Sequence, residues 1–213
     1  MSHLHFQPPQ PSPQRNIELS KLLSWILRHG ANEAKLPIDT NGYVDIDVIL
    51  KTQRFVAKKF SLNEIKNVVA NDRKQRFALD TLPNGKMRIK ANQGHSMANV
   101  QMTMTRIDDA SKVPIAVHGT YYRFWEKIKS EGLKRMSRNH IHLTENEVFS
   151  GDTSGFRSSS EILIYVDVSK AMAEGVVFYR SANNVILTEG LDGVLSSKYF
   201  ARVVDRVTKK RLL

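Results

Sequence analysis

The sequence predicts an α+β fold with two lobes, an N-terminal lobe of helices closed by a hairpin and a C-terminal lobe that is mainly β. Three observations support this division. Apolar side chains recur at helical spacing over residues 16–72, apolar and polar side chains alternate over residues 73–92, and the apolar runs after residue 114 are short and bounded by turn signals. A chain of 213 residues is long enough to form two such cores.

The composition is that of a globular protein with a basic excess. Hydrophobic residues make up 41% of the chain and charged residues 25%, which is ordinary for a soluble domain, while 32 Lys and Arg against 21 Asp and Glu give a formal net charge of +11. This excess indicates an anionic partner, with nucleic acid the first choice. The alternative is a protein that is merely basic.

Two absences narrow the possible classes of protein. The sequence has no cysteine, which excludes disulfides and thiolate zinc sites. It also has no apolar run approaching the ~20 residues that span a bilayer, and its first residues lack the apolar core of a signal peptide. We therefore expect no membrane association and a cytoplasmic or nuclear location.

Residues 1–15 are rich in Pro, Gln and Ser and are expected to form a disordered arm. The first helix is expected to begin at Asn16, because the apolar side chains that follow fall on one face, and to end at Gly30, a common helix stop. Arg28 and His29 occupy its last turn. They are candidate functional residues, although cations at this end also stabilise a helix through its dipole.

Two further helices are expected in the first lobe. A turn at Asn41-Gly42 precedes a helix capped by Asp45 or Asp47. Residues 61–64, Ser-Leu-Asn-Glu, form a capping box that opens the third helix.

A hairpin completes this lobe, which we place at residues 16–92. Residues 76–80 and 86–90 alternate in polarity on either side of the turn Pro83-Asn84-Gly85. Three helices followed by a hairpin make a winged-helix pattern, a common nucleic-acid-binding module. The outward face of the hairpin carries a row of cations that fits contacts to a nucleic-acid backbone, or else a solvated edge strand protected by charge: Lys86, Arg88 and Lys90.

Residues 93–113 show no convincing period and are expected to join the lobes. The second lobe is expected at residues 114–205, and a Gly/Ser-rich loop at residues 150–160 is suited to covering a ligand. The basic tail, residues 206–213, is expected to be frayed. The later strands of the lobe are expected at residues 140–143, 161–167, 176–180 and 185–188.

The most informative stretch of the second lobe runs from His118 to Leu143. A buried strand ends at His118-Gly119-Thr120, and an amphipathic helix follows and stops at Gly132. Polar strand ends, a glycine that admits close backbone approach and a cluster of cations fit a cradle for a phosphorylated ligand. The cations are Lys134, Arg135, Arg138 and His140.

A metal site is the alternative for the two histidines of this stretch. His140 and His142 are two residues apart on a strand, so both point to one face. No cysteine and no obvious third ligand accompany them. We therefore expect no metal, and we expect the strand to place one of the two histidines beside a bound cofactor.

No single motif identifies the chain, but their order does. Taken together, six motifs resemble those of the NAD-dependent tRNA (RNA) 2′-phosphotransferases, and the resemblance covers roughly residues 17–205. The motifs are Leu27-Arg28-His29-Gly30, Arg73-Lys74-Gln75-Arg76-Phe77, Ala91-Asn92-Gln93-Gly94-His95-Ser96, His118-Gly119-Thr120, Arg138-Asn139-His140-Ile141-His142-Leu143 and Phe178-Tyr179-Arg180-Ser181-Ala182-Asn183-Asn184-Val185-Ile186-Leu187.

The resemblance implies a winged-helix RNA lobe and an NAD lobe that resembles ADP-ribosyltransferases. Three sets of site residues are expected, the first two from the resemblance and the third from the basic residues of the N-terminal lobe. The catalytic set is Arg28, His29, Arg76 and Arg138. The cofactor-binding set is His118, Gly119, Thr120, His140, Ser181 and Asn183, of which the last two fit a turn-stabilising role equally well. The RNA-binding set is Lys74 together with Lys86, Arg88 and Lys90.

The implied reaction moves the internal 2′-phosphate at an RNA splice junction to NAD⁺, which is consumed as a co-substrate without a metal. The expected RNA is spliced tRNA. The products are 2′-hydroxyl RNA, nicotinamide and ADP-ribose 1″,2″-cyclic phosphate. Guanidinium groups suit this chemistry because they bind phosphoryl oxygens bidentately. The expected partners are this RNA and NAD⁺, and the expected oligomeric state is a monomer.

Two alternative functions remain open from the sequence. One is an ADP-ribosyltransferase that leaves ADP-ribose on a nucleic acid or protein, for which Glu189 is the obvious late glutamate. The other is a non-enzymatic winged-helix RNA binder. The four matched catalytic positions argue against the second.

Overall fold

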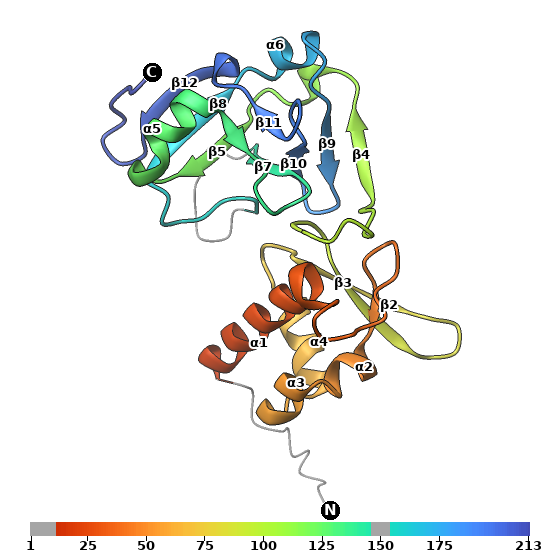
Figure 1. Ribbon diagram of the computed structural model, residues 1–213. Helices are drawn as coiled ribbons and strands as arrows, with labels where there is room; N and C mark the ends of the chain where they lie inside the picture. Colours follow the sequence, from red (N-terminus) through yellow and green to blue (C-terminus); the bar gives the residue numbers. More distant parts are fainter. Residues whose placement is uncertain (1–11, 146–153) are drawn as a thin grey trace, which may run out of the picture.

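The computed structural model describes residues 12–145 and 154–213 and shows an α+β protein (Figure 1). Residues 1–11 of the expected arm and residues 150–153 of the expected covering loop lie outside the described residues. Figure 1 shows the helices α1 to α4 grouped on one side of the molecule and a larger sheet grouped on the other. Within the described ranges, no helix is both long and apolar enough to cross a membrane.

The N-terminal region, residues 12–102, packs helices against a small sheet. Its antiparallel strands lie in the order β1-β3-β2, and Val44 pairs with Ile89 while Phe77 pairs with Ala91. The elements are α1 (Pro13–Trp25), the π-helical turn η1 (Ile26–Gly30), β1 (Val44–Asp45), α2 (Ile46–Leu50), α3 (Gln53–Lys58), α4 (Leu62–Ala70), β2 (Phe77–Thr81) and β3 (Met87–Ala91).

The first helix begins earlier than expected, so the predicted arm is wrong for residues 12–15. Ser12 is the N-cap and its hydroxyl accepts a hydrogen bond from the Arg15 backbone N–H (3.3 Å), while Pro13 takes the first helical position, where a missing N–H costs nothing. Arg15 then forms an ion pair with Glu64 of α4. The low apolar content of this segment hid a helix start that polar contacts stabilise.

The other local signals of this region fare unequally. The capping box is confirmed, since the Ser61 and Glu64 side chains bond to each other's backbone N–H. The hairpin is confirmed as well. Asp45 is the N-cap of α2 but makes no side-chain cap bond there, and the short helix α3 was not expected as a separate element.

Residues 93–113 do more than join two lobes. Met97 and Val100 are buried in the same core as Leu23 and Phe55, so the N-terminal core continues past the expected boundary. Strand β4 (Met104–Ile107) then pairs with β9 at the edge of the larger sheet. Only one end of β4 is buried, which explains why its sequence shows no clear alternation.

The C-terminal region, residues 104–213, is built on a seven-stranded sheet whose strands pair antiparallel in the order β12-β8-β5-β7-β10-β9-β4. Its other strands are β5 (Val117–Thr120), β7 (Ile141–Thr144), β8 (Ile162–Val166), β9 (Phe178–Ser181), β10 (Val185–Thr188) and β12 (Phe200–Asp205). The remaining elements are η2 (Ala110–Lys112), α5 (Tyr122–Glu131), β6 (Leu133–Lys134), α6 (Val168–Ala173), β11 (Val194–Leu195) and η3 (Ser197–Tyr199), of which β6 and β11 form a separate pair.

The basic tail is not frayed, contrary to expectation. The Asp205 carboxylate accepts hydrogen bonds from the backbone of Val207 (2.9 Å) and Thr208 (2.6 Å), which turns the chain back. The Leu212 N–H then donates to Val203 of β12 (2.8 Å), and its side chain packs against the core. Together these hydrogen bonds and the packing of Leu212 fix a segment that composition alone predicts to be loose.

Candidate anion-binding cleft

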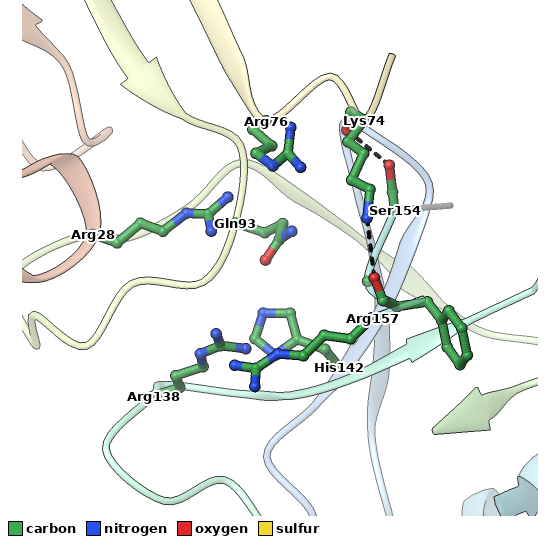
Figure 2. A pocket seen from close by; sticks show the side chains of 10 residues that line it. Arg28, Lys74, Arg76, Gln93, Arg138, His142, Ser154 and Arg157 are labelled. Carbon is green, nitrogen blue, oxygen red and sulfur yellow. Dashed lines mark hydrogen bonds between the residues drawn. The ribbon is translucent and has the colours of Figure 1, made fainter. Parts of the chain in front are cut away.

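A cleft of about 250 Å³ lies where the N-terminal and C-terminal regions meet. Five of its lining side chains are cationic, and no described residue that lines it is acidic. Figure 2 shows the guanidinium groups converging from opposite sides of the cleft. The lining residues are Arg28, Lys74, Arg76, Gln93, Arg138, His142, Ser154, Gly155, Phe156 and Arg157.

Arg28 enters from the π-helical turn that ends the first helix. A Cβ on Gly30 would lie 2.5 Å from the Trp25 ring, so this turn needs a glycine in order to close against the tryptophan. The Nε and Nη2 atoms of Arg28 are buried and have no hydrogen-bond partner among the described residues. Burial, followed by the charges of Arg138 and Arg76, lowers the pKa of Arg28 to about 10, which still leaves it charged at neutral pH.

Arg76 is held by a tight turn that precedes β2. The Asp72 carboxylate accepts hydrogen bonds from the backbone N–H groups of Lys74 (3.2 Å) and Arg76 (2.6 Å) and also pairs with the Arg76 guanidinium. Gln75 between them has a φ of +46°, in the left-handed region. One carboxylate therefore fixes both the turn and the direction of the arginine, and it lies behind the cleft rather than in it.

Two arginines come from the C-terminal region. The turn before β7 supports Arg138, because the Arg138 N–H donates to the Arg135 carbonyl (3.1 Å) and Arg135 Nη1 donates back to the Arg138 carbonyl (3.0 Å). Burial, followed by the charge of Arg157, lowers the pKa of Arg138. Both guanidiniums point toward the ring of His142 in Figure 2.

The turn that carries Arg76 is tied to the C-terminal region through Lys74. The Lys74 carbonyl accepts hydrogen bonds from Ser154 Oγ (2.7 Å) and Asn183 Nδ2 (3.1 Å), and its Nζ donates to the Phe156 carbonyl (3.1 Å). The Phe156 ring in turn packs over Gly119, where a Cβ would lie 2.3 Å from the ring. These contacts set the distance between the arginines of the two regions.

His142 lies on β7, is 6% exposed, and its ring lies beside the guanidiniums of Arg138 and Arg157 in Figure 2. The Nδ1 atom of His118, on the neighbouring strand β5, lies 2.9 Å from the backbone carbonyl oxygen of His142, and this hydrogen bond holds the strand in place. Burial, followed by the charges of Arg138 and Arg28, lowers the pKa of His142 well below its usual value, so the ring is neutral. Its Nε2 is buried and has no hydrogen-bond partner in the part of the chain that the structure describes.

The cleft brings together three of the four predicted catalytic residues, and the fourth lies beside it. His29 is exposed and does not line the cleft. Its Nδ1 lies 2.9 Å from Ser96 Oγ, and burial with the charges of Arg138 and Arg28 lowers its pKa. Of the predicted RNA-binding residues, Lys74 lines the cleft and the three hairpin cations do not.

None of the six predicted cofactor-binding residues is among the described residues that line the cleft. Ser181 Oγ donates to Asn183 Oδ1 (2.9 Å) and accepts from the Val185 N–H (3.0 Å), and Asn183 reaches Lys74, so these two residues hold a turn and tie the regions together. His140 packs edge-on against Tyr179, with ring centroids 6.3 Å apart. The binding role of the six stays a prediction.

The hairpin cations are in a different environment. Arg88 forms ion pairs with Asp80 (2.7 Å) and Asp39 (3.4 Å) and lies over the Tyr43 ring, 4.2 Å from its centroid. Lys90 Nζ lies 4.6 Å from the same centroid, and Lys86 is exposed at the turn. Their alternation with the buried Ile89 was predicted, but these partners were not.

Sequence reasoning missed several lining residues. Gln93 was only part of a motif, and Arg157 was hidden in a Gly/Ser-rich loop. His142 was considered as a metal ligand or, together with His140, as one of two candidates for a position beside the cofactor. Arg157 carried a usable signal, since an arginine after an aromatic residue in a loop expected to cover a ligand is a candidate contact. Within residues 12–145 and 154–213, no group of three or more His, Asp or Glu side chains could hold a metal ion.

Comparison with known proteins gives one consistent match. Residues 14–190 match the family model described as RNA 2′-phosphotransferase, Tpt1 / KptA family. The chain is 41% identical over 193 residues to tRNA 2′-phosphotransferase 1 of Danio rerio, covering 88% of this chain and 85% of that protein, and 36% identical over 192 residues to tRNA 2′-phosphotransferase of Saccharomyces cerevisiae, covering 87% and 84%. A Schizosaccharomyces pombe relative is 46% identical over 188 residues, but the chain spans only about half, 51%, of its length.

Proposed function

The chain belongs to the RNA 2′-phosphotransferase family, and from this premise we propose that it transfers an internal 2′-phosphate of RNA to NAD⁺. The products are RNA with a 2′-hydroxyl, nicotinamide and ADP-ribose 1″,2″-cyclic phosphate. The RNA is tRNA that carries the phosphate at its splice junction, and the protein acts as a monomer in the cytoplasm or nucleus.

One observation carries the proposal: the guanidiniums of Arg28, Arg76 and Arg138 face one cleft whose described lining holds no carboxylate. Arg76 is paired with Asp72, but the buried Nε and Nη2 of Arg28 have no partner among the described residues, and a buried cation is costly unless it is paired. A phosphate dianion would supply the missing partner, and the two buried nitrogens of Arg28 that lack one are donors that a phosphate oxygen can accept from. The donor set also fits the diphosphate of a dinucleotide, because Lys74 and Arg157 extend the same positive surface.

In the first step the cleft orients the RNA phosphate. NAD⁺ supplies, as a consumed co-substrate, the ribose carbon that this phosphate attacks and the nicotinamide that leaves. Arg28 and Arg76 hold the nonreacting phosphoryl oxygens, and Arg138 lies between the phosphate and the ribose. Because a phosphate dianion is already nucleophilic, this step depends on orientation rather than on a strong base.

In the second step negative charge concentrates on the phosphoryl group as a ribose hydroxyl displaces the RNA oxygen. The same arginines stabilise this charge without a metal, since they are already aimed at the phosphate. In this proposal His29 donates a hydrogen bond or a proton to the departing RNA oxygen. Its link to Ser96 fixes the direction of the ring.

The two regions take separate roles in this proposal. The helices and hairpin of the N-terminal region act as a winged-helix RNA lobe, and the seven-stranded sheet acts as an NAD lobe of ADP-ribosyltransferase type. His118, Gly119 and Thr120 at the end of β5, with His140, contact the dinucleotide. Phe156 over Gly119 supports this assignment, because it joins the end of β5 to the wall of the cleft.

The test is incubation with an oligonucleotide carrying one labelled internal 2′-phosphate, with and without NAD⁺. We expect the label in ADP-ribose cyclic phosphate and a 2′-hydroxyl in the RNA, and no reaction with a matched oligonucleotide phosphorylated only at its 3′ end. ADP-ribose retained on the RNA would indicate the transferase alternative that uses Glu189. Binding of RNA without NAD⁺-dependent chemistry would refute the enzymatic proposal.

A further inference from the structure

The side chains of the cleft are unevenly divided between hydrogen-bond donors and acceptors. Arginine and lysine have no acceptor atom, and they make up five of the ten lining residues. The Ser154 hydroxyl donates to the Lys74 carbonyl. The acceptor atoms among the described lining side chains are Gln93 Oε1, the Ser154 hydroxyl oxygen and the imidazole of His142, and of these only the imidazole is basic.

Phosphate groups need only donors, but the proposed reaction also involves a hydroxyl. When the ribose 2″-hydroxyl attacks phosphorus it must lose its proton, and a guanidinium or an ammonium group that is already protonated cannot accept it. The amide oxygen of Gln93 can accept a hydrogen bond but is too weakly basic to take a proton. The imidazole is the one basic group left in the described lining of the cleft.

The surroundings of His142 suit this role. The ring is buried, lies next to the guanidiniums of Arg138 and Arg157 in Figure 2, and presents an Nε2 that has no partner among the described residues. The charges that face it are those of Arg138 and Arg28, with His140 and His118 as the titratable neighbours. His118 of β5 also bonds to the His142 carbonyl, and His142 pairs with Leu187 of β10. The backbone that carries the ring is therefore held along both edges of strand β7.

From this geometry we infer that His142 is a catalytic residue of the second step, in which its Nε2 accepts the proton of the attacking ribose hydroxyl. The inference rests on the proposed function. In the step, the O2″–H bond breaks as the proton passes to Nε2, the O2″–P bond forms, and the P–O bond to the RNA 2′-oxygen breaks. That oxygen leaves with the electron pair and is protonated, which gives the RNA 2′-hydroxyl, and the imidazolium returns its proton to water.

The positive surroundings give the role a physical advantage. A protonated imidazole among four guanidiniums is disfavoured, so the ring enters the step in its neutral, accepting form. It becomes charged only when the phosphoryl group beside it gathers negative charge, and this is the moment at which an imidazolium is stabilised. No such ring is available from His29, which is exposed and already bonded to Ser96.

The experiment compares the two steps in the full-length protein and in the variant His142→Gln, which keeps an acceptor but cannot take a proton. We expect formation of ADP-ribosylated RNA 2′-phosphate to stay within about threefold of wild type, since no base is needed, and its conversion to cyclic phosphate to fall by about 10²-fold or more. The intermediate should therefore accumulate. Equal losses in both steps, or unchanged conversion, would overturn the inference.

A matched control is His95→Gln. His95 is a buried histidine whose two ring nitrogens also lack partners among the described residues, but it does not line the cleft. We expect the ratio of the two rates to stay as in wild type. If it shifts as it does for His142→Gln, the effect comes from removing any buried histidine and the inference is wrong.

A measurement on the wild-type protein covers the case in which the variant does not fold. A nitrogen-15 spectrum of the histidine rings at pH 7 should show His142 neutral with its Nε2 unprotonated. An Nε2–H tautomer would overturn the inference. Failure of the proposed function looks different, because wild-type protein would then release no ADP-ribose cyclic phosphate at all.

Discussion

The cleft and the β2–β3 hairpin are the two basic surfaces that the sequence predicted, and they differ in what accompanies their cations. Arg88 on the hairpin has carboxylates on two sides, Asp80 and Asp39, and an aromatic ring beneath it. Arg28 in the cleft has two buried nitrogens with no partner among the described residues, and its nearest charged neighbours include further arginines.

This difference separates cations that stabilise the fold from cations held for a ligand. A paired surface arginine satisfies its own charge and adds little affinity for an anion. Buried guanidiniums that repel one another cost stability, and they persist in a fold where a ligand or a reaction uses them. The cleft is therefore the stronger candidate for phosphate binding, although the sequence shows cations at both surfaces.

The largest expected effect comes from replacing Arg28 by an apolar side chain of similar length. Arg28→Met should lower kcat/KM for the 2′-phosphorylated RNA by about 10²–10³-fold, because one charged phosphate contact contributes about 2–5 kcal/mol of transition-state stabilisation. Its thermal stability should be unchanged or higher, since a buried cation repelled by Arg138 and Arg76 is removed. Both quantities follow from single-turnover kinetics and a thermal melt.

Arg88→Met is the matched control and should show the reverse pattern. It leaves Asp80 and Asp39 without their cation, so the melting temperature should fall, while kcat/KM should change by less than about threefold. If Arg88→Met impaired catalysis as strongly as Arg28→Met, the distinction between the two surfaces would be wrong.

The second effect concerns the histidine behind the cleft. Burial, followed by the charge of Arg28, lowers the pKa of His95 to about 4. Since the folded pKa lies below that of the unfolded chain, the unfolded state binds the proton first, and the contribution of neutral His95 is present above pH 6.5 and is lost as the pH falls toward 4. A shift of this size corresponds to about 3 kcal/mol.

The check is urea unfolding of wild type and His95→Gln at pH 7 and pH 4.5. Other groups titrate in this window, so the useful quantity is the difference between the two proteins in how far stability falls. Between pH 7 and pH 4.5, the free energy of unfolding should fall less in His95→Gln than in wild type. Parallel losses would mean that the ring is not held neutral by its surroundings.

The third effect tests how the two halves of the cleft are held together. Asn183→Ala removes the hydrogen bond to the Lys74 carbonyl and so loosens the turn that carries Arg76. We expect kcat to fall by about tenfold, because small displacements of charged groups are costly in an oriented site. The KM for NAD⁺ should stay within about twofold. A rise in that KM with kcat unchanged would support the direct cofactor contact that the family resemblance implies.

The elements that sequence predicted best are those with local signals. The capping box at Ser61 and the hairpin turn before Lys86 each specify their structure within a few residues, and both form as expected. The early start of α1 was not predicted, because Arg15 is stabilised by Glu64, which lies 49 residues away in the sequence. The folded-back tail was not predicted for a similar reason, since Leu212 is held by a hydrogen bond to Val203 of β12.

The site divides in the same way. Arg28, Arg76 and Arg138 could be named from ordered motifs, but no local pattern indicates that they share a cleft with Arg157 and His142. Convergence depends on the contacts of Lys74 with Ser154 and Asn183, which join segments 80 and 109 residues apart. Pairings of this range leave no periodic pattern in the sequence.

The smallest effect sharpens the comparison within the hairpin itself. Lys86 is exposed, whereas Arg88 is paired, so only the first should release a counterion when RNA binds. Lys86→Gln should reduce the slope of log K against log salt by about 0.7, the value for one contact to a single strand, while Arg88→Gln should leave the slope as it is. The measurement is a salt titration of binding to an RNA without a 2′-phosphate. If wild type and a variant lacking all three hairpin cations showed equal slopes, the hairpin would make no contact with the RNA backbone. The cleft would then remain as the candidate phosphate-binding element among the described residues.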